Sequence, residues 1–146
     1  LVLARSGFHH SANYRSAMCF GTAQIIDDAE EKAEALDAVV DRFYPGRTGV
    51  LRENDPQETK GTMVIGMRIE EASAKIRAGG VSDDPADVDA RVWAGVIPVE
   101  TRLCQPEICP KVPQGVVYPD HLAHFQVGRR LDEVLTASQA LYEKLG

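Results

Sequence analysis

The first part of the chain alternates between apolar and polar residues, which predicts extended structure. Leu1–Gly7 has the pattern of a strand, with no capping or turn residue ahead of it. Residues 14–26 alternate with the two-residue period of a β-strand. One face carries Ala17, Cys19, Ala23 and Ile25, and the other carries Tyr14, Ser16, Met18 and Phe20. Because both faces contain apolar residues, we expect both to be largely buried.

Apolar residues at helical spacing predict two amphipathic helices. The first spans Asp28 to Tyr44: Asp28 stands three residues before Glu31, as in an N-terminal cap, and Pro45 and Gly46 end the helix. Its apolar positions are Ala29, Ala33, Leu36, Val39, Val40 and Phe43. The second helix lies near the C-terminus, with apolar positions at Leu131, Val134, Leu135, Leu141 and Leu145. We expect its apolar face to pack on the body of the protein or on a second subunit.

The middle of the chain mixes short strands with loops. Two further strands are predicted by alternation at residues 62–69, with one face on the core, and by β-forming residues at 92–100. The remaining segments are a loop at 47–60 with a helical turn near Gln57–Thr59, an acidic connector at 82–89 with one or two helical turns, and a proline-rich extended loop at 105–119.

Length and charge limit the classes of function. The chain has 146 residues, of which 44% are hydrophobic, and a formal net charge of -6. This length favours one core, and the acidic balance opposes binding to phosphate backbones or anionic lipid. We therefore expect a small-molecule partner, with no nucleic acid and no membrane. Because no apolar run approaches the ~20 residues of a transmembrane helix, we also expect a soluble, cytoplasmic protein.

The cysteines and the later histidines do not predict a metal site. Cys104 and Cys109 are crowded by prolines, and only two residues separate His121 from His124. That gap is shorter than the three to five residues that let two imidazoles of a helix face one metal. We expect no metal, and we give neither later histidine a function.

Polar and ring-bearing residues gather just before and within the second strand. His9 and His10 lie in the loop ahead of it, where an imidazole near a cofactor could pass protons. Tyr14, Arg15 and Ser16 open the strand itself, and its pleat directs the Arg15 and Ser16 side chains to opposite faces. This combination favours a cofactor site.

Three blocks of the sequence carry a resemblance to a known family. They are residues 1–21 with Phe8-His9-His10-Ser11 and Asn13-Tyr14-Arg15-Ser16, residues 69–75, and Val92-Trp93-Ala94-Gly95-Val96-Ile97-Pro98. With the helix between them, they resemble the FMN-binding split barrels of the pyridoxamine 5'-phosphate oxidase-like family, which includes 5-nitroimidazole reductases. The resemblance covers about residues 1 to 100.

The resemblance implies a fold class that is mainly β with peripheral helices, a split β-barrel that is partial and lacks its N-terminal strands. Residues 1–119 would be the C-terminal portion of the flavin-binding domain, and residues 120–146 a helical extension. The segment expected upstream of Leu1 would carry the phosphate-binding residues.

The resemblance also implies a site and a function. Tyr14, Arg15 and Ser16 would lie along the flavin ring, and Trp93 would reach it across the interface of a homodimer. The cofactor would be FMN, and the activity an oxidoreductase that passes electrons from NADH or NADPH to a small acceptor. Two alternatives stay open: a flavin- or haem-binding carrier or sensor without turnover, and a half-barrel that binds nothing by itself.

Overall fold

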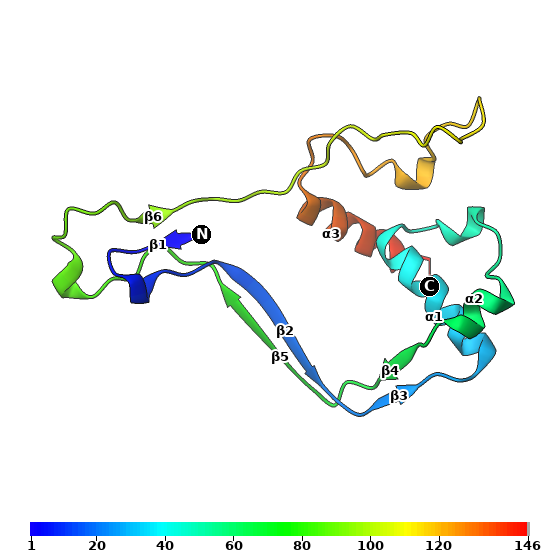
Figure 1. The fold of residues 1–146 in the computed structure, drawn as a ribbon, viewed down its shortest axis with the longest axis horizontal. Helices are drawn as coiled ribbons and strands as arrows, with labels where there is room; N and C mark the ends of the chain where they lie inside the picture. The colour runs from blue at the N-terminus through cyan, green and yellow to red at the C-terminus, as the bar shows by residue number, and fades with distance from the viewer. Residues whose placement is uncertain (146) are drawn as a thin grey trace. The chain divides into compact units, whose positions relative to one another are not determined.

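The computed structural model describes residues 1–145, which form two compact units that interleave along the sequence. Unit 1 comprises Leu1–Ala23 and Met67–Val99. Unit 2 comprises Gln24–Gly66 and the chain from Glu100 onward. Figure 1 shows the order of the helices and strands along the chain. The predicted boundary at residues 119/120 stays a prediction.

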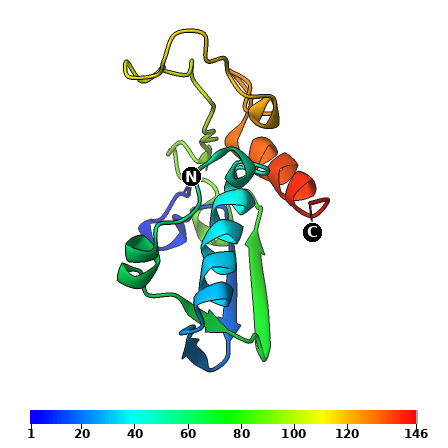
Figure 2. The ribbon, with the colours of Figure 1, turned by 90° about the vertical axis from the view of Figure 1, so that its right-hand side faces the viewer.

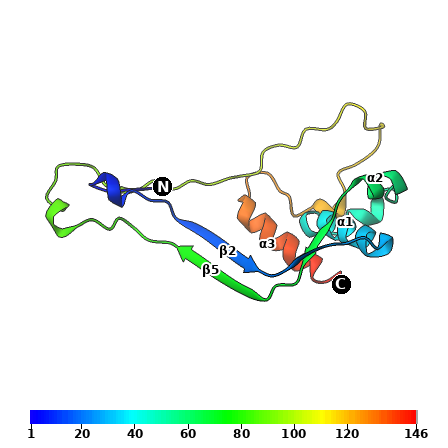
Figure 3. The ribbon, with the colours of Figure 1, turned by 60° about the horizontal axis from the view of Figure 1, so that its bottom comes forward.

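Unit 1 is built on a long two-stranded ribbon (Figure 3). Strand β2, Tyr14–Phe20, pairs antiparallel with β5, Glu71–Arg77, over seven residues without a bulge. A second, shorter pair joins β1, Val2–Leu3, to β6, Gly95–Val96. Val2 and Ala4 are buried, with 1% and 3% of their surface exposed, and they form the small core of this unit.

The ribbon ends at a close crossing of two backbones. The Glu70 amide donates to the Phe20 carbonyl at 2.9 Å. A Cβ atom on Gly21 would lie 2.1 Å from the carbonyl oxygen of Arg68, so only glycine allows this approach. Beyond the crossing, β3, Ala23–Ile25, pairs with β4, Ile65–Met67, and the chain continues into unit 2.

Unit 2 is helical. Helix α1, Ala29–Phe43, begins where the Asp28 carboxylate accepts hydrogen bonds from the amides of Glu30 and Glu31, as the sequence predicted. It ends before Gly46, whose φ of 77° is readily adopted only by glycine. The short helix α2, Pro56–Gly61, follows and is fixed by a capping box.

The C-terminal helix α3, Leu131–Tyr142, packs against α1 (Figure 2). Val134 and Ser138 are the buried residues of α3 and have no exposed surface. At its rim, Arg42 donates a hydrogen bond to Gln139 at 2.7 Å. The predicted second amphipathic helix is therefore confirmed.

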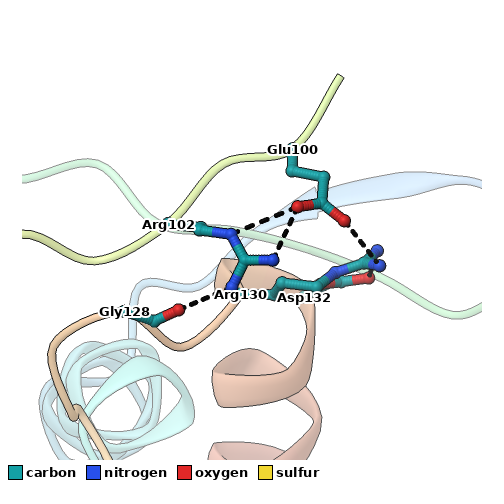
Figure 4. Close-up of polar contacts among 5 residues, drawn as sticks. All are labelled: Glu100, Arg102, Gly128, Arg130 and Asp132. Atoms are coloured by element: carbon teal, nitrogen blue, oxygen red, sulfur yellow. Dashed lines mark hydrogen bonds and ion pairs between the residues drawn. The ribbon is translucent and has the colours of Figure 1, made fainter. Parts of the chain in front are cut away.

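An exposed ion-pair network fixes the start of α3 (Figure 4). Glu100 accepts from Arg102 at 2.7 Å and from Arg130 at 3.4 Å. Arg102 also donates to the Gly128 carbonyl, and Arg130 pairs with Asp132 at 2.7 Å. Hydrogen bonding to Arg130 lowers the pKa of Asp132.

Several predicted strands are shorter in the structure. The strand at 14–26 is interrupted at Gly21 and Thr22, because the Gly21 crossing turns the chain there. The segments at 62–69 and 92–100 keep only β4 and β6, and β5 was not predicted. The single-turn 3₁₀ helices lie at Gly7–His9 (η1), Thr48–Val50 (η2), Pro85–Asp87 (η3) and Asp120–Leu122 (η4). The loop at 105–119 is confirmed.

The strands of the described chain form three two-stranded sheets, and the α-helices belong to unit 2. This agrees with the expectation of strands accompanied by helices, although the sheets do not close into a barrel within residues 1–145. No helix within that range is long and apolar enough to cross a membrane.

Candidate functional site

The β2–β5 ribbon has two chemically different faces. In an antiparallel pair, residues opposite each other share a face. Tyr14 stands opposite Arg77 and Ser16 opposite Lys75, so a ring, a hydroxyl and two cations share one face. Met18 and Phe20 continue this face. We call it the Tyr14 face.

The opposite face is small and mostly apolar. It carries Arg15 opposite Ile76, Ala17 opposite Ala74, and Cys19 opposite Ala72. Arg15 is therefore separated from Ser16 by the thickness of the ribbon, as the predicted alternation requires. Arg15 and Ser16 cannot both contact one edge of the same flat ligand here.

The two cationic side chains of the Tyr14 face, Arg77 and Lys75, differ in whether they already have a polar partner. Arg77 donates to the Asn13 side-chain oxygen at 2.6 Å, and Asn13 is itself held by the backbone of Gly79. Lys75 places its ammonium 5.9 Å from the centre of the Tyr14 ring. No carboxylate within residues 1–145 lies in ion-pair range of Lys75. Its charge is therefore available to an anionic ligand.

The expectation that both faces of this strand are buried is wrong for the described chain. Every residue of β2 is exposed, including Phe20 at 51%. Met63, Ile65 and Ile69, which were expected to face a core, are also exposed. The physical reason is that β2 has one partner strand and no layer packed on either side within residues 1–145.

The two adjacent histidines both contact Ser6, through different atoms of that residue. The Nδ1 atom of His9 lies 2.8 Å from the Ser6 hydroxyl, and its Nε2 atom lies 3.9 Å from an Asp84 oxygen. His10 instead contacts the Ser6 carbonyl through Nδ1 at 2.8 Å. The polar contacts of both rings are thus with the η1 turn and η3, and a role for either at the flavin stays a prediction.

Trp93 is exposed, and its ring covers Gly95. A Cβ atom on Gly95 would lie 2.9 Å from the indole ring, so the absence of a side chain at 95 allows this contact. Trp93 as a whole residue is 64% exposed. Trp93 is therefore available to a partner or ligand, as an interface aromatic would be.

Unit 2 contains several open cavities that sequence reasoning missed, including two of several hundred cubic ångströms. The larger, of about 670 Å³, is mostly apolar and is lined by residues of the proline-rich loop such as Ile108, Val112 and Tyr118. The second, of about 440 Å³, is lined by His121, His124 and Leu141, among others. Tyr14, Arg15, Ser16 and Trp93 line neither cavity.

The histidines of the smaller cavity have distinct surroundings. The Nε2 atom of His124 lies 2.8 Å from the hydroxyl of the buried Ser138. Burial, and then the charge of Arg129, lower the pKa of His124. The Nε2 atom of His121 is buried and has no hydrogen-bond partner within the described chain. Such an unsatisfied atom calls for a ligand, a water or an ion.

The sequence of the ribbon has a counterpart among known proteins. Residues 1–76 match the pyridoxamine 5'-phosphate oxidase family, and this range contains all of β2 and also Lys75 of β5. The chain belongs to this family. The resemblance found in the sequence is thereby confirmed for the segment that carries Tyr14, Arg15 and Ser16.

Two solved structures are similar to this family member over most of its length. The flavocytochrome Anf3 from Azotobacter vinelandii is 38% identical, with a TM-score of 0.76, over 87% of this chain and 59% of that one. The FAD and haem binding protein from Mycobacterium smegmatis is 37% identical, with a TM-score of 0.73, over 88% of this chain and 63% of that one. No curated protein matches the sequence.

The chain spans about three fifths of the length of these two relatives. The family match also ends before Trp93 and before most of the residues that line the two cavities of unit 2. Membership in the pyridoxamine 5'-phosphate oxidase family therefore supports the ribbon as the candidate cofactor site more directly than it supports any other part of the chain.

Proposed function

We propose that this protein binds a flavin, FMN, on the Tyr14 face and acts as an oxidoreductase. The observation that carries the proposal is the family match over the ribbon, together with Lys75, which shares a face with Tyr14 and Ser16 and has no ion-pair partner within residues 1–145. The two similar structures are both named for a flavin or for a flavocytochrome, which supports a flavin here.

The residues of this face suit the polar edge of a flavin. Reduced flavin carries negative charge, which nearby donors and cations stabilise. Lys75 would supply the cation and Ser16 a hydroxyl donor, while the Tyr14 ring offers an apolar surface for stacking. Arg15 lies on the opposite face of the ribbon from Ser16, so the proposal assigns it no contact with that edge.

Electrons would come from a reduced nicotinamide and pass to a small oxidised acceptor, and we propose a cytoplasmic setting for this reaction. The protein's part is to position both molecules and to hold charge near the ring. The exposed ribbon fits a site that a second copy of the chain covers, and Trp93 would then contribute from the partner. We therefore propose a homodimer built as a split barrel.

A second candidate is a flavin- or haem-binding protein without turnover. The relative named for FAD and haem and the relative named a flavocytochrome favour it, as does the smaller cavity of unit 2. The His121 imidazole lines this cavity, its Nε2 atom has no hydrogen-bond partner within residues 1–145, and it would be the axial ligand for haem iron. This atom belongs to a residue for which the sequence predicted no function.

The visible spectrum of the purified full-length protein separates the two candidates. Flavin absorbance that bleaches with NADH or NADPH supports the oxidoreductase, and flavin absorbance that persists supports a binder. A Soret band that His121→Ala abolishes supports haem. The protein is also refolded or incubated with each cofactor. If it then contains neither flavin nor haem, the proposal is contradicted.

Variants of the ribbon test the location of the flavin. Lys75→Met and Ser16→Ala should each weaken flavin binding by roughly tenfold. Each substitution removes one hydrogen bond to the flavin, and the loss of about 1.4 kcal/mol changes a dissociation constant tenfold. Arg15→Met and Lys111→Met are the controls, since the first lies on the opposite face and the second in the loop of unit 2. Equal binding by Lys75→Met and by the controls would show that the Tyr14 face is not the site.

A further inference from the structure

Two short turns of unit 1 bring together one imidazole and two carboxylates. A ring nitrogen of His9 at the end of η1 and a carboxylate oxygen from each of Asp84 and Asp87 around η3 all lie within 4.8 Å of one another. We propose that these three residues bind a divalent transition-metal ion of the zinc class. This site is separate from the proposed flavin face and does not depend on it.

An ion pair joins the two turns that carry the site. The Asp83 carboxylate accepts from the Arg5 amide at 2.8 Å and from its guanidinium at 2.6 Å. The Asp83 side chain is only 3% exposed, and these hydrogen bonds, the backbone one first, lower its pKa. Because Asp83 is fixed beside Arg5, Asp84 is placed close to His9, which follows four residues after Arg5.

The ring of His9 is oriented for coordination. The Ser6 hydroxyl contacts its Nδ1 atom at 2.8 Å, and this leaves Nε2 directed at Asp84, 3.9 Å away. Metal-binding histidines commonly use their second nitrogen in this way, since the outer hydrogen bond fixes the ring. Only 24% of the His9 side chain is exposed, so few other orientations are open to it.

The backbone also fixes the spacing of the two carboxylates. The amide of Asp87 donates to the carbonyl of Asp84 at 2.9 Å, which closes the single turn of η3. Residues three apart in a 3₁₀ turn lie on the same side, so both carboxylates face the same way. The nearby Arg5 is engaged by Asp83 and does not neutralise them.

The distances are close to those of a real coordination shell. Zinc bonds of about 2.1 Å separate two tetrahedral ligand atoms by about 3.4 Å. The His9 and Asp84 atoms lie 3.9 Å apart, and the Asp84 side chain is 70% exposed and free to rotate inward. A small rotation of this exposed carboxylate would therefore complete the geometry.

The ligand set selects the class of metal. One imidazole and two carboxylates suit Zn²⁺ and its first-row neighbours, whereas Mg²⁺ and Ca²⁺ prefer oxygen ligands alone. Three protein ligands also leave a position for water, as in open zinc sites. We therefore expect binding of Zn²⁺ and Co²⁺, with no comparable binding of Mg²⁺.

Calorimetric titration of the chelator-treated full-length protein with Zn²⁺ tests the site. We expect one Zn²⁺ per chain, and a Co²⁺ spectrum with visible bands typical of nitrogen and oxygen ligation. Asp87→Asn and His9→Ala should each weaken this binding more than 100-fold, since changes in outer hydrogen bonds alone cost about 10–100-fold. Ser6→Ala should fall within that smaller range.

Matched controls separate coordination from general damage. Asp89→Asn and His10→Ala change the same residue types just outside the cluster and should bind Zn²⁺ as the wild type does. Zn²⁺ should raise the unfolding temperature of the wild type and of both controls, but not that of Asp87→Asn. This second measurement also shows that the variant is folded.

Three results would overturn the inference. One is equal Zn²⁺ affinity in Asp87→Asn and Asp89→Asn, and another is a Co²⁺ spectrum unchanged by His9→Ala. The third is binding of Mg²⁺ as tight as that of Zn²⁺. Flavin absorbance recorded on the same samples distinguishes this inference from the proposed flavin site. Loss of Zn²⁺ binding with flavin retained concerns only the metal site, and loss of flavin with Zn²⁺ binding retained concerns only the flavin site.

Discussion

Substitution of Gly21 by alanine tests the account of how the ribbon ends. In the structure, an added Cβ atom would lie 2.1 Å from the Arg68 carbonyl oxygen and 3.0 Å from a side-chain carbon of Met67. Close carbon–oxygen contacts in proteins are about 3.3 Å, so the two backbones would have to separate by about 1.2 Å. The contacting atom belongs to the backbone and cannot rotate away.

The cost follows from two terms. Forcing extra volume into a tight contact costs about 1–3 kcal/mol. The separation would also break the hydrogen bond from the Glu70 amide to the Phe20 carbonyl, which is worth about 1 kcal/mol. We therefore expect Gly21→Ala to lower the free energy of unfolding by about 2–4 kcal/mol.

Urea unfolding followed by circular dichroism measures this effect. With a slope of about 2 kcal/mol per molar urea, the midpoint should fall by about 1–2 M. Gly79→Ala is the matched control at the other end of the ribbon, where an added Cβ meets nothing within 4 Å. The control should unfold within about 1 kcal/mol of the wild type. If the midpoint of Gly21→Ala equals that of Gly79→Ala, the crossing does not constrain the strand as described.

Three further changes test other parts of the structure. Asp28→Ala removes the cap of α1 and should cost about 1 kcal/mol in thermal unfolding, whereas Asp27→Ala, which caps nothing, should cost much less. Because burial lowers the pKa of His124, the unfolded chain takes up this proton first as the pH falls. The free energy of unfolding should therefore decline below about pH 6.5, and His124→Gln should flatten this part of the profile if the histidine is responsible. Gly95→Ala should displace the Trp93 ring and shift its fluorescence, and an unchanged emission spectrum would contradict the contact.

The helices could be predicted because their signals are local. Asp28 caps α1 through its own side chain, and Gly46 ends that helix through its own backbone conformation. The alternation at 14–20 likewise gave the direction of each side chain, including the separation of Arg15 from Ser16. These features depend on residues that lie within a few positions of one another.

The rest depends on contacts between distant parts of the sequence. β5 lacks clear alternation, and it is a strand because it pairs with β2 from more than fifty residues away. The break at Gly21 depends on Arg68, and the cluster around His9 depends on the pairing of Arg5 with Asp83. The pattern of apolar residues within one segment cannot predict which distant segment it will contact.

The long ribbon leaves two rows of backbone hydrogen-bonding groups without a partner strand within residues 1–145. Because β2 and β5 pair only with each other in the described chain, the outer edge of each strand is open over seven residues. Open edges recruit further strands, and where no native strand arrives they promote aggregation. Residues 1–145 expressed by themselves would therefore be expected to self-associate through these edges, and solubility would depend on whatever strand normally occupies them.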